Sequence, residues 1–354
     1  RSNEAKSLGI KMGEPVFKCR GQLRENKVTL FSANFVLYGD ISRRVMEILS
    51  FFSPQIEIYS VDEAFLKFPD CLDYTKLGFE IREKILRWTS IPVGIGFGKT
   101  KTLAKVANEM AKKTKIGVLD AHQFNVDSIL EEFPIDDVWG IGRQFAKKLR
   151  NKGIKSALDF KNMCPKYVKK NMHIPGLRTQ MELKGISCIP VEELVPKRKT
   201  VLSSRSFGKK LTSFNDLIGA ISQNIVVASE KLRKQKLAAR KLMIFILTSR
   251  HREDYYSKSV VLNLSEASNV TTHLIKYARE GLKAIYKPGK LYAKSGVMMM
   301  DLSDQEAIQS HLLTTRRAYK EYLGDAKLMS VVDRINKEHG KQLVVPAISQ
   351  WNGR

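Results

Sequence analysis

Two acidic residues, Asp62 and Glu63, stand side by side in the segment Ile56–Phe68, which reads IEIYSVDEAFLKF. The rest of the segment is rich in β-branched and aromatic residues, which predicts a tight β-hairpin with the acidic pair at its turn. Hard divalent cations prefer oxygen ligands on rigid strands, so two carboxylates at one sheet edge suit Mg²⁺-dependent phosphoryl transfer. The competing interpretation is that both are ordinary solvated turn residues.

A second motif that could bind phosphate is Gly-Lys-Thr at residues 98–100, which follows a predicted strand, Ile91–Phe97, and precedes a predicted helix. This is the setting of a P-loop, but that motif requires glycine five residues before the Gly-Lys pair. Val93 occupies the required position, and the nearby glycines are Gly94 and Gly96. The spacing argues against an NTPase and favours glycines that let the strand pack closely against its neighbours.

The composition is strongly basic, with 61 Lys and Arg against 36 Asp and Glu and a formal net charge of +25 at pH 7. Such an excess predicts a polyanionic partner, either nucleic acid or an anionic membrane surface. No stretch approaches the roughly 20 apolar residues that span a bilayer, so nucleic acid is favoured. The four cysteines form no CxxC pair and no signal-peptide pattern is present, which predicts a reducing, cytoplasmic setting.

Two segments without acidic residues are predicted to contact DNA. Residues 139–154, WGIGRQFAKKLRNKGI, are typical of a helix–hairpin–helix, whose glycines expose backbone N–H groups to a phosphate at a helix start. Residues 196–210 form a second basic segment, and the run 231–241 is either a third or only a solvated helix end. The residues predicted to contact DNA are Gly140, Gly142, Arg143, Lys147, Arg205 and Lys209.

The elements that must position these residues follow from hydrophobic periodicity. The order of elements is that of a βαββαβ sandwich without its first strand. It consists of a helix over Tyr38–Ser50, the hairpin, a helix around 77–85, the strand and a helix over Thr100–Lys113. Residues 116–190 predict short helices and turns, and residues 193–199 predict a polar linker.

Beyond the linker the same order of elements is complete. The predicted elements are strand Thr200–Phe207, helix Phe214–Lys234, strands Leu242–Thr248 and Ser259–Leu264, helix Val270–Ile285 and strand Leu291–Met300. The sequence from Asp301 onward is more polar, and one helical stretch is predicted near Leu328–Ile335.

The segments YSVDEAFLKF and IPVGIGFGKTKTLAKVANEMAKK, together with SANFVLYGDISRRV, VWGIGRQFAKKL and SSRSFGKKL, resemble the Y-family translesion DNA polymerases, specifically the bacterial UmuC-like branch. The resemblance covers nearly the whole chain and implies an α+β, right-hand polymerase. The implied domains are partial fingers (1–34), a ferredoxin-like palm lacking its first strand (35–118), a helix–hairpin–helix thumb (119–192), the linker (193–199), a little finger (200–301) and a tail (302–354).

The resemblance implies error-prone synthesis past DNA lesions in SOS mutagenesis and repair. By the resemblance, Asp62 is a ligand of two Mg²⁺ ions, and Glu63 supports the metal and the primer 3′-end. The resemblance also places Lys6 and Lys112 near the triphosphate of the dNTP. Family members begin with a strand that carries one more metal-binding Asp, and this chain opens after it. We therefore expect a fragment that binds primer–template DNA without extending it; the alternative is a non-catalytic DNA-binding subunit.

Near the end of the chain, Gln309, Leu312 and Leu313 resemble a loose sliding-clamp-binding peptide, although a plain linker would read similarly. The family resemblance also implies UmuD′ and RecA as partners, and no membrane partner.

Overall fold

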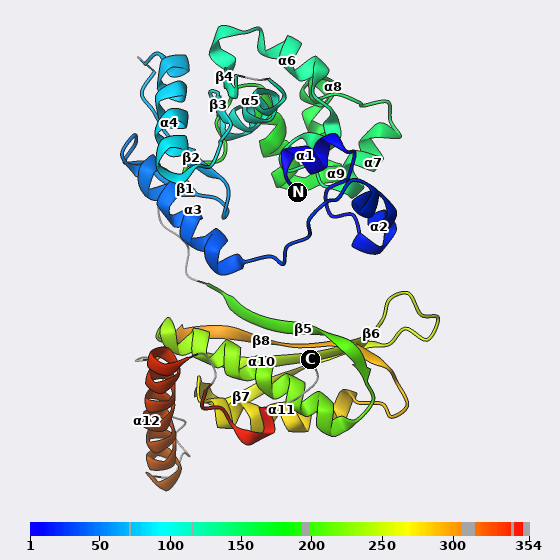
Figure 1. Ribbon diagram of the computed structural model, residues 1–354, viewed down its shortest axis with the longest axis vertical. Helices are drawn as coiled ribbons and strands as arrows, with labels where there is room; N and C mark the ends of the chain where they lie inside the picture. The colour runs from blue at the N-terminus through cyan, green and yellow to red at the C-terminus, as the bar shows by residue number, and fades with distance from the viewer. Residues whose placement is uncertain (71, 115, 193–197, 306–315, 341–342, 350–354) are drawn as a thin grey trace. The chain divides into compact units, whose positions relative to one another are not determined.

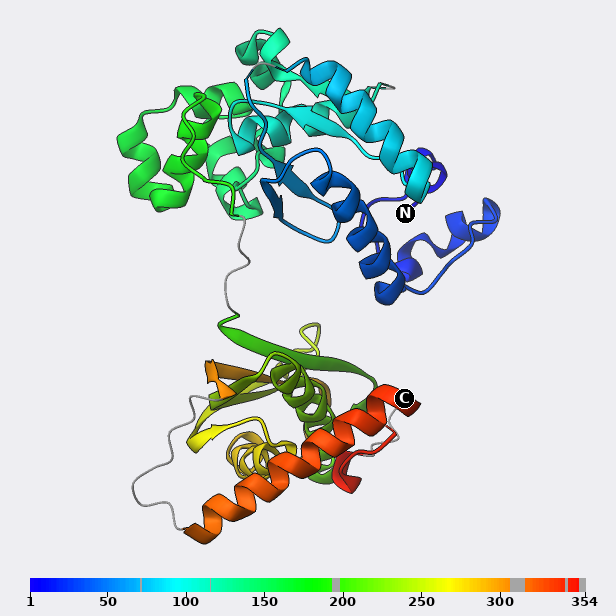
Figure 2. The same ribbon diagram turned by 90° about the vertical axis from the view of Figure 1, so that its left-hand side faces the viewer.

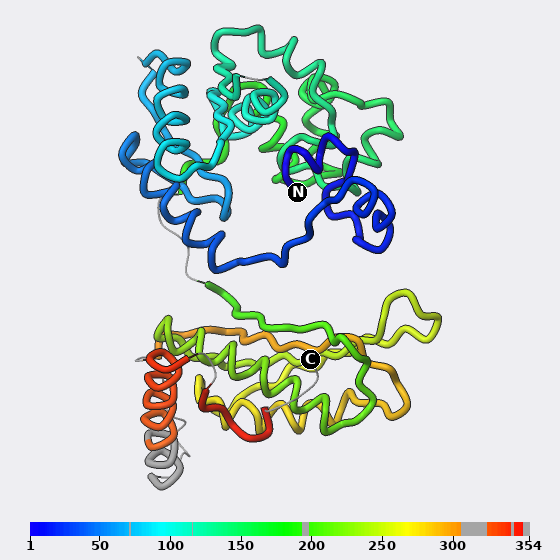
Figure 3. Tube along the Cα trace, viewed as in Figure 1, coloured from blue at the N-terminus to red at the C-terminus, as the bar shows by residue number. Residues whose placement is uncertain are grey.

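The computed structural model describes residues 1–354 except 71, 115, 193–197, 306–315, 341–342 and 350–354. The chain divides into two compact units, residues 1–195 and 196–354, with the division inside the predicted linker range. Figure 3 shows that the chain passes from the first unit to the second only once. Helices and sheets are mixed in both units, so the fold is of the expected α+β class (Figure 1).

The first unit begins with two short helices, α1 (Asn3–Ser7) and α2 (Val16–Glu25), around a small apolar cluster of Ile10, Cys19 and Leu23. Helix α3 (Phe35–Ser50) follows. It starts before the predicted Tyr38 because the Asn34 side chain accepts a hydrogen bond from the N–H of Leu37 and caps the helix.

Two small sheets lie at the centre of this unit. Strands β1 (Ile56–Ile58) and β2 (Ala64–Leu66) form the predicted antiparallel hairpin, whereas β3 (Ile95–Phe97) pairs in parallel with β4 (Val118–Asp120). The predicted strand from Ile91 is therefore shorter than expected, since its pairing starts only where the N–H of Ile95 reaches Gly117 O. Among the described residues the sheets remain separate two-stranded pairs rather than one ferredoxin-like sheet.

Helices α4 (Tyr74–Thr89) and α5 (Lys101–Lys113) complete the setting of these sheets. A Cβ added to Gly96 would lie 2.1 Å from the backbone nitrogen of Asn108 in α5. One added to Gly98 would lie 2.8 Å from the backbone nitrogen of Ala104. The expectation that the glycines of this segment allow close packing is confirmed at Gly96, and the two glycines let α5 lie directly against β3.

Helices α6 (Val126–Glu132), α7 (Arg143–Arg150), α8 (Ala157–Asn162) and α9 (Pro165–Leu183) form the helical part of the unit. They share an apolar core with α5, in which large side chains such as Phe133 and Phe160 are fully buried. The short helices and turns predicted for residues 116–190 are confirmed in part, because β4 was not predicted and α9 is 19 residues long, with a kink at His173.

One buried carboxylate joins this helical part to α5. Glu182, near the end of α9, has no exposed surface, and its Oε2 accepts hydrogen bonds from the N–H and the hydroxyl of Thr102 at 3.0 and 3.2 Å. Its Oε1 accepts from the backbone N–H groups of Cys188 and Ile189 at 2.8 and 3.0 Å. The negative charge also lies at the positive N-terminal end of α5, which further favours its burial.

The second unit is the predicted complete βαββαβ unit. Its elements are β5 (Thr200–Leu211), α10 (Phe214–Lys234), β6 (Leu237–Thr248), β7 (Ser257–Ser268), α11 (Thr271–Ile285) and β8 (Tyr292–Asp304). All neighbouring strands are antiparallel in the order β5-β8-β6-β7, and the helices α10 and α11 pack on the sheet (Figure 1). The strands extend beyond their predicted ends because residues there still pair along the ladder, such as Leu211 with Tyr292, Leu237 with Asp304 and Ala239 with Ser268.

The C-terminal segment also differs from its prediction. Helix α12 (Arg316–His339) is much longer than the stretch expected near Leu328–Ile335, and it runs along the second unit (Figure 2). Nε and Nη2 of the Arg233 guanidinium donate to Oδ2 and Oδ1 of Asp333 in this helix, at 2.6 and 2.8 Å, and Met329 is buried. Among the described residues no helix is long and apolar enough to cross a membrane.

We expect Glu182→Gln to lower the free energy of unfolding of the first unit by about 2–3 kcal/mol. The amide nitrogen of Gln cannot accept the hydrogen bonds that one of the two carboxylate oxygens accepts. Urea unfolding followed by tryptophan fluorescence would measure the change. Glu47→Gln is the matched control, since Glu47 forms only an exposed pair with Arg43 and should change stability by no more than about 0.5 kcal/mol. Equal effects of the two substitutions would contradict the prediction.

Candidate active site and nucleic-acid-binding surface

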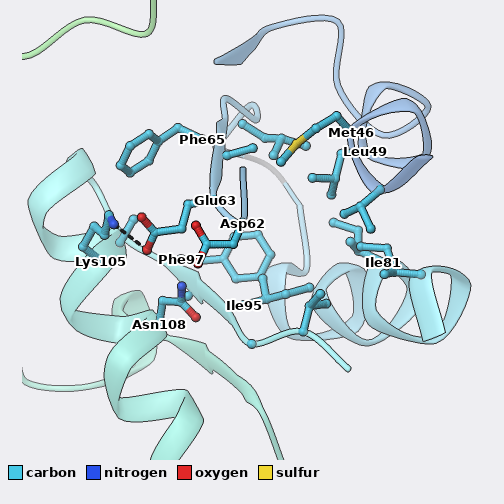
Figure 4. Close-up of a pocket in the computed structure, with 18 of the residues that line it drawn as sticks. Met46, Leu49, Asp62, Glu63, Phe65, Ile81, Ile95, Phe97, Lys105 and Asn108 are labelled. Atoms are coloured by element: carbon cyan, nitrogen blue, oxygen red, sulfur yellow. Dashed lines mark ion pairs between the residues drawn. The ribbon is translucent and has the colours of Figure 1, made fainter. Parts of the chain in front are cut away.

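The carboxylate pair lies at the tip of the β1–β2 hairpin. The backbone N–H groups of Tyr59 and Ser60 both donate to the carbonyl oxygen of Glu63 at 3.0 Å, which closes the turn. The hydroxyl of Ser60 donates to Oδ1 of Asp62 at 2.5 Å. In Figure 4 the side chains of Asp62 and Glu63 project in the same direction, with their carboxyl groups next to each other. The predicted hairpin therefore brings the two carboxylates together.

Both carboxylates line a cavity of about 170 Å³. Its walls come from β2, β3 and the helices α3, α4 and α5, and they include Met46, Ile81 and Phe97 (Figure 4). Because β2 and β3 contribute to the walls and β1 and β4 do not, the cavity lies between the two small sheets. The side-chain oxygen of Asn108, which also lines the cavity, is buried without a hydrogen-bond partner.

A lysine on α5 lies against the second carboxylate. The ammonium of Lys105 is 2.6 Å from Oε1 of Glu63, and the two side chains are 18% and 31% exposed (Figure 4). The same ammonium lies 5.0 Å from the ring centre of Tyr59 and 5.9 Å from that of Phe65, within the range of cation–π attraction. Lys105 is therefore held by one carboxylate and two aromatic faces.

The aromatic rings around Lys105 continue into the helical part of the unit. The indole N–H of Trp139 donates to the hydroxyl of Tyr59 at 3.0 Å, and the Trp139 ring packs 5.6 Å from the rings of Tyr59 and Phe65. The ammonium of Lys101 lies 5.0 Å from the Phe65 ring centre and forms a nearly buried ion pair with Glu57. Phe65 is thus surrounded by two lysines and two aromatic rings.

The donor set fits a hard divalent cation in kind. Asp62 and Glu63 offer carboxylate oxygens, the ligands that Mg²⁺ prefers, and the Lys105 ammonium shows that a cation is attracted to this position. The number of donors is small, because the described ranges hold no group of three or more His, Cys, Asp or Glu side chains that could bind a metal ion. The pair offers two carboxylates, fewer than the three or more side chains that such a cluster would contain.

The two lysines predicted to bind the triphosphate are not brought to this cavity. Lys6 is exposed on α1, and Lys112 is exposed at the end of α5, where it pairs with Glu109 at 3.2 Å. Neither residue lines the cavity that holds Asp62 and Glu63. Their role as nucleotide ligands stays a prediction.

The predicted helix–hairpin–helix has the expected glycine geometry. Gly140 has φ of +88°, and Gly142 is the N-cap of α7 without a side-chain cap. The N-terminal turn of α7 therefore presents its N–H groups without competition from a capping side chain. Arg143 and Lys147 on this helix are exposed. The arrangement suits a phosphate contact that reads no base.

In the second unit, Arg205 and Lys209 are exposed on β5. Both are free to meet a phosphate backbone from this strand. The predicted clamp-binding residues Gln309, Leu312 and Leu313 lie outside the described residues.

Sequence reasoning missed Lys105, Tyr59 and Trp139. A signal for Lys105 was present, because Lys101, Lys105 and Asn108 follow a helical spacing that places them on one face of α5. Nothing in the sequence could assign Trp139 to Tyr59, which lies 80 residues earlier.

Sequence models of one family match three parts of the chain. The impB/mucB/samB family matches residues 1–109, its C-terminal domain matches residues 198–312, and its helix–hairpin–helix motif matches residues 125–154.

Curated relatives match almost the full length of this chain. The chain is 38% identical to protein UmuC of Salmonella typhimurium over 96% of this chain and 82% of that protein. It is 24% identical to DNA polymerase IV 1 of Bacillus subtilis over 97% of this chain and 81% of that protein. Among solved structures, a Y-family DNA polymerase chimera of Dbh and Dpo4 shares the fold, with a TM-score of 0.65 at 22% identity over 85% of this chain and 86% of that chain.

Gly140 and Gly142 make a matched pair for testing the hairpin geometry. Gly140→Ala should cost about 1–2 kcal/mol of stability, because its φ is +88° and the new Cβ would lie 2.7 Å from Oγ1 of Thr179. Gly142→Ala should cost less than about 0.5 kcal/mol, since no atom lies within 4 Å of its Cβ position. Urea unfolding of the two variants measures both values, and a larger loss at Gly142 would show that the geometry is wrong.

Proposed function

The chain belongs to the impB/mucB/samB family of UmuC-like, Y-family DNA polymerases, and from this premise we propose that it holds primer–template DNA for error-prone synthesis past lesions. The observation that carries the proposal is the pair of adjacent carboxylates, Asp62 and Glu63, at the edge of a cavity and beside a cation. Acidic side chains gathered at one point of a chain with a net charge of +25 mark a site for a positively charged ligand.

In this proposal Asp62 is a ligand of both Mg²⁺ ions, and Glu63 supports the metal and the primer end. Bound Mg²⁺ would supply charge neutralisation at the α-phosphate and activation of the primer 3′-hydroxyl. The hairpin turn keeps both carboxylates on one side, and the Ser60 hydroxyl fixes Oδ1 of Asp62. The β1–β2 pairing and the two ion pairs from α5 would limit the movement of the hairpin, as a metal site of rigid oxygen ligands requires.

We propose that two surfaces contact DNA. In the first unit, backbone N–H groups at the start of α7 and the side chains of Arg143 and Lys147 would contact phosphates. In the second unit, Arg205 and Lys209 on β5 would follow the duplex backbone. Contacts of this kind bind DNA without reading its sequence, which a polymerase that copies any template requires.

The remaining ligand and partner assignments belong to the same proposal. Lys6 and Lys112 would offset the charge of the dNTP triphosphate as point-like cations. The partners are those implied by the family: the sliding clamp, bound through Gln309, Leu312 and Leu313, together with UmuD′ and RecA.

A second candidate function is a DNA-binding subunit without catalysis. It is favoured by one observation: within the described residues, no third acidic side chain joins Asp62 and Glu63. Both functions predict DNA binding, so nucleotide incorporation separates them.

We predict that the chain binds primer–template DNA with an affinity that falls steeply with salt. Arg205→Ala and Lys209→Ala should each reduce the slope of log K against log salt by about 0.9, because each removes one phosphate contact. Fluorescence anisotropy of a labelled duplex at several salt concentrations measures the slope. Lys283→Ala is the control, since Lys283 is exposed and pairs with Glu280 on α11. A slope that stays the same in both β5 variants would exclude β5 from the DNA surface.

A primer-extension assay tests the metal site. The polypeptide of residues 1–354 should bind DNA without adding nucleotides, because Asp62 and Glu63 alone leave a two-ion site short of ligands. In a form of the protein that does extend primers, Asp62→Ala should abolish incorporation and leave DNA affinity unchanged. Collapse of DNA binding in Asp62→Ala would instead give Asp62 a structural role, and efficient Mg²⁺-dependent extension by residues 1–354 would refute the first expectation.

A further inference from the structure

The charge balance at the carboxylate pair is unusual for a site that must bind a divalent cation. Asp62 and Glu63 together carry two negative charges, and the Lys105 ammonium, 2.6 Å from Glu63, offsets one of them. The neighbouring ion pair of Lys101 with Glu57 is neutral overall. The net charge available to attract a divalent cation is therefore about −1 rather than −2, and a like charge stands directly at the ligand.

We propose that Lys105 is a built-in counter-ion of Glu63 that a divalent cation must displace, so that the carboxylate pair binds the cation strongly only when nucleotide phosphates add negative charge. The inference rests on the proposed metal site. Lys105 makes occupation of the site depend on the incoming nucleotide, because the triphosphate restores the negative charge that the ammonium cancels.

The structure also provides a place for the displaced ammonium. The rings of Tyr59 and Phe65 already lie 5.0 and 5.9 Å from the Lys105 nitrogen, so it can leave Glu63 and keep its aromatic contacts. Trp139 holds the Tyr59 hydroxyl at 3.0 Å and packs against both rings. Because Trp139 touches the rings that hold Lys105, its fluorescence should respond to the exchange.

The first unit contains a matched lysine for comparison. Lys84 on α4 lies over three aromatic rings, at 5.0 Å from Phe51, 5.2 Å from Phe52 and 5.1 Å from Trp88. Within the part of the chain that the structure describes, Lys84 forms no ion pair, and it does not line the carboxylate cavity. Lys84→Met therefore removes a similar cation–π contact and leaves the charge at Glu63 unchanged.

The main experiment measures Mn²⁺ binding to the chain without DNA or nucleotide, from the electron paramagnetic resonance signal of the free ion. Lys105→Met should lower the Mn²⁺ dissociation constant about tenfold, the size expected for removing one unit charge a few ångströms from a divalent ion in a largely aqueous setting. Lys105→Arg, which keeps the charge, and Lys84→Met should both bind Mn²⁺ as the unchanged chain does. The gain in Lys105→Met should shrink as the salt concentration rises.

Glu63→Gln separates failure of this inference from failure of the metal site. The gain from Lys105→Met should disappear in the double variant with Glu63→Gln, because the two residues act on each other. If Glu63→Gln weakens Mn²⁺ binding but Lys105→Met binds no more tightly than Lys84→Met, the counter-ion role is overturned and the metal site stands. If Glu63→Gln leaves Mn²⁺ binding unchanged, the metal site itself is overturned.

A second measurement follows Trp139 directly, after Trp88→Phe and Trp351→Phe remove the other two tryptophans. In the chain that keeps Lys105, Mn²⁺ alone should alter Trp139 emission only at high concentration. Addition of dATP should lower the required Mn²⁺ concentration about tenfold. In Lys105→Met, Mn²⁺ should alter the emission at this lower concentration without dATP. Equal Mn²⁺ midpoints with and without dATP in the chain that keeps Lys105 would refute the proposal. If circular dichroism shows that Lys105→Met is unfolded, Lys105→Gln replaces it in both measurements.

Discussion

The buried carboxylate of Glu182 is the contact on which the rest of the first unit depends. A buried charge is tolerated only when it is fully hydrogen-bonded, and Glu182 achieves this by accepting from Thr102 at the start of α5 and from Cys188 and Ile189 beyond α9. The requirement fixes α5 against the helical part of the unit. Since α5 also carries, at this same N-terminal end, both lysines that contact the carboxylate hairpin, the Glu182 contact helps to fix the position of the site.

The second constraint is the distribution of charge at the hairpin. The chain is strongly basic, and two acids of the hairpin, Glu57 and Glu63, each pair with a lysine of α5 whose ammonium also lies near the Phe65 ring. Burial next to aromatic rings strengthens such pairs relative to exposed ones, because less water competes for the charges. The hairpin is thereby held against α5 by Lys101 and Lys105.

The second unit exposes basic strand residues on a stable folded core. Its apolar core lies between the sheet and the helices α10 and α11, so strand residues such as Arg205 and Lys209 are left for solvent or phosphate. The bidentate contact of Arg233 with Asp333 adds α12 to the same unit. Helix α12 is therefore part of the fold of this unit.

The sequence by itself determined the local elements and the chemistry of single segments: the hairpin with Asp62 and Glu63, helix Phe214–Lys234 with its observed bounds, and the glycine turn at Gly140. These follow from short-range periodicity and turn preferences. Only the tertiary structure decided that Lys105 faces Glu63, that Trp139 reaches Tyr59, and that two separate small sheets flank a cavity. Such contacts join residues far apart in the chain, and they are set by packing, which no local pattern encodes.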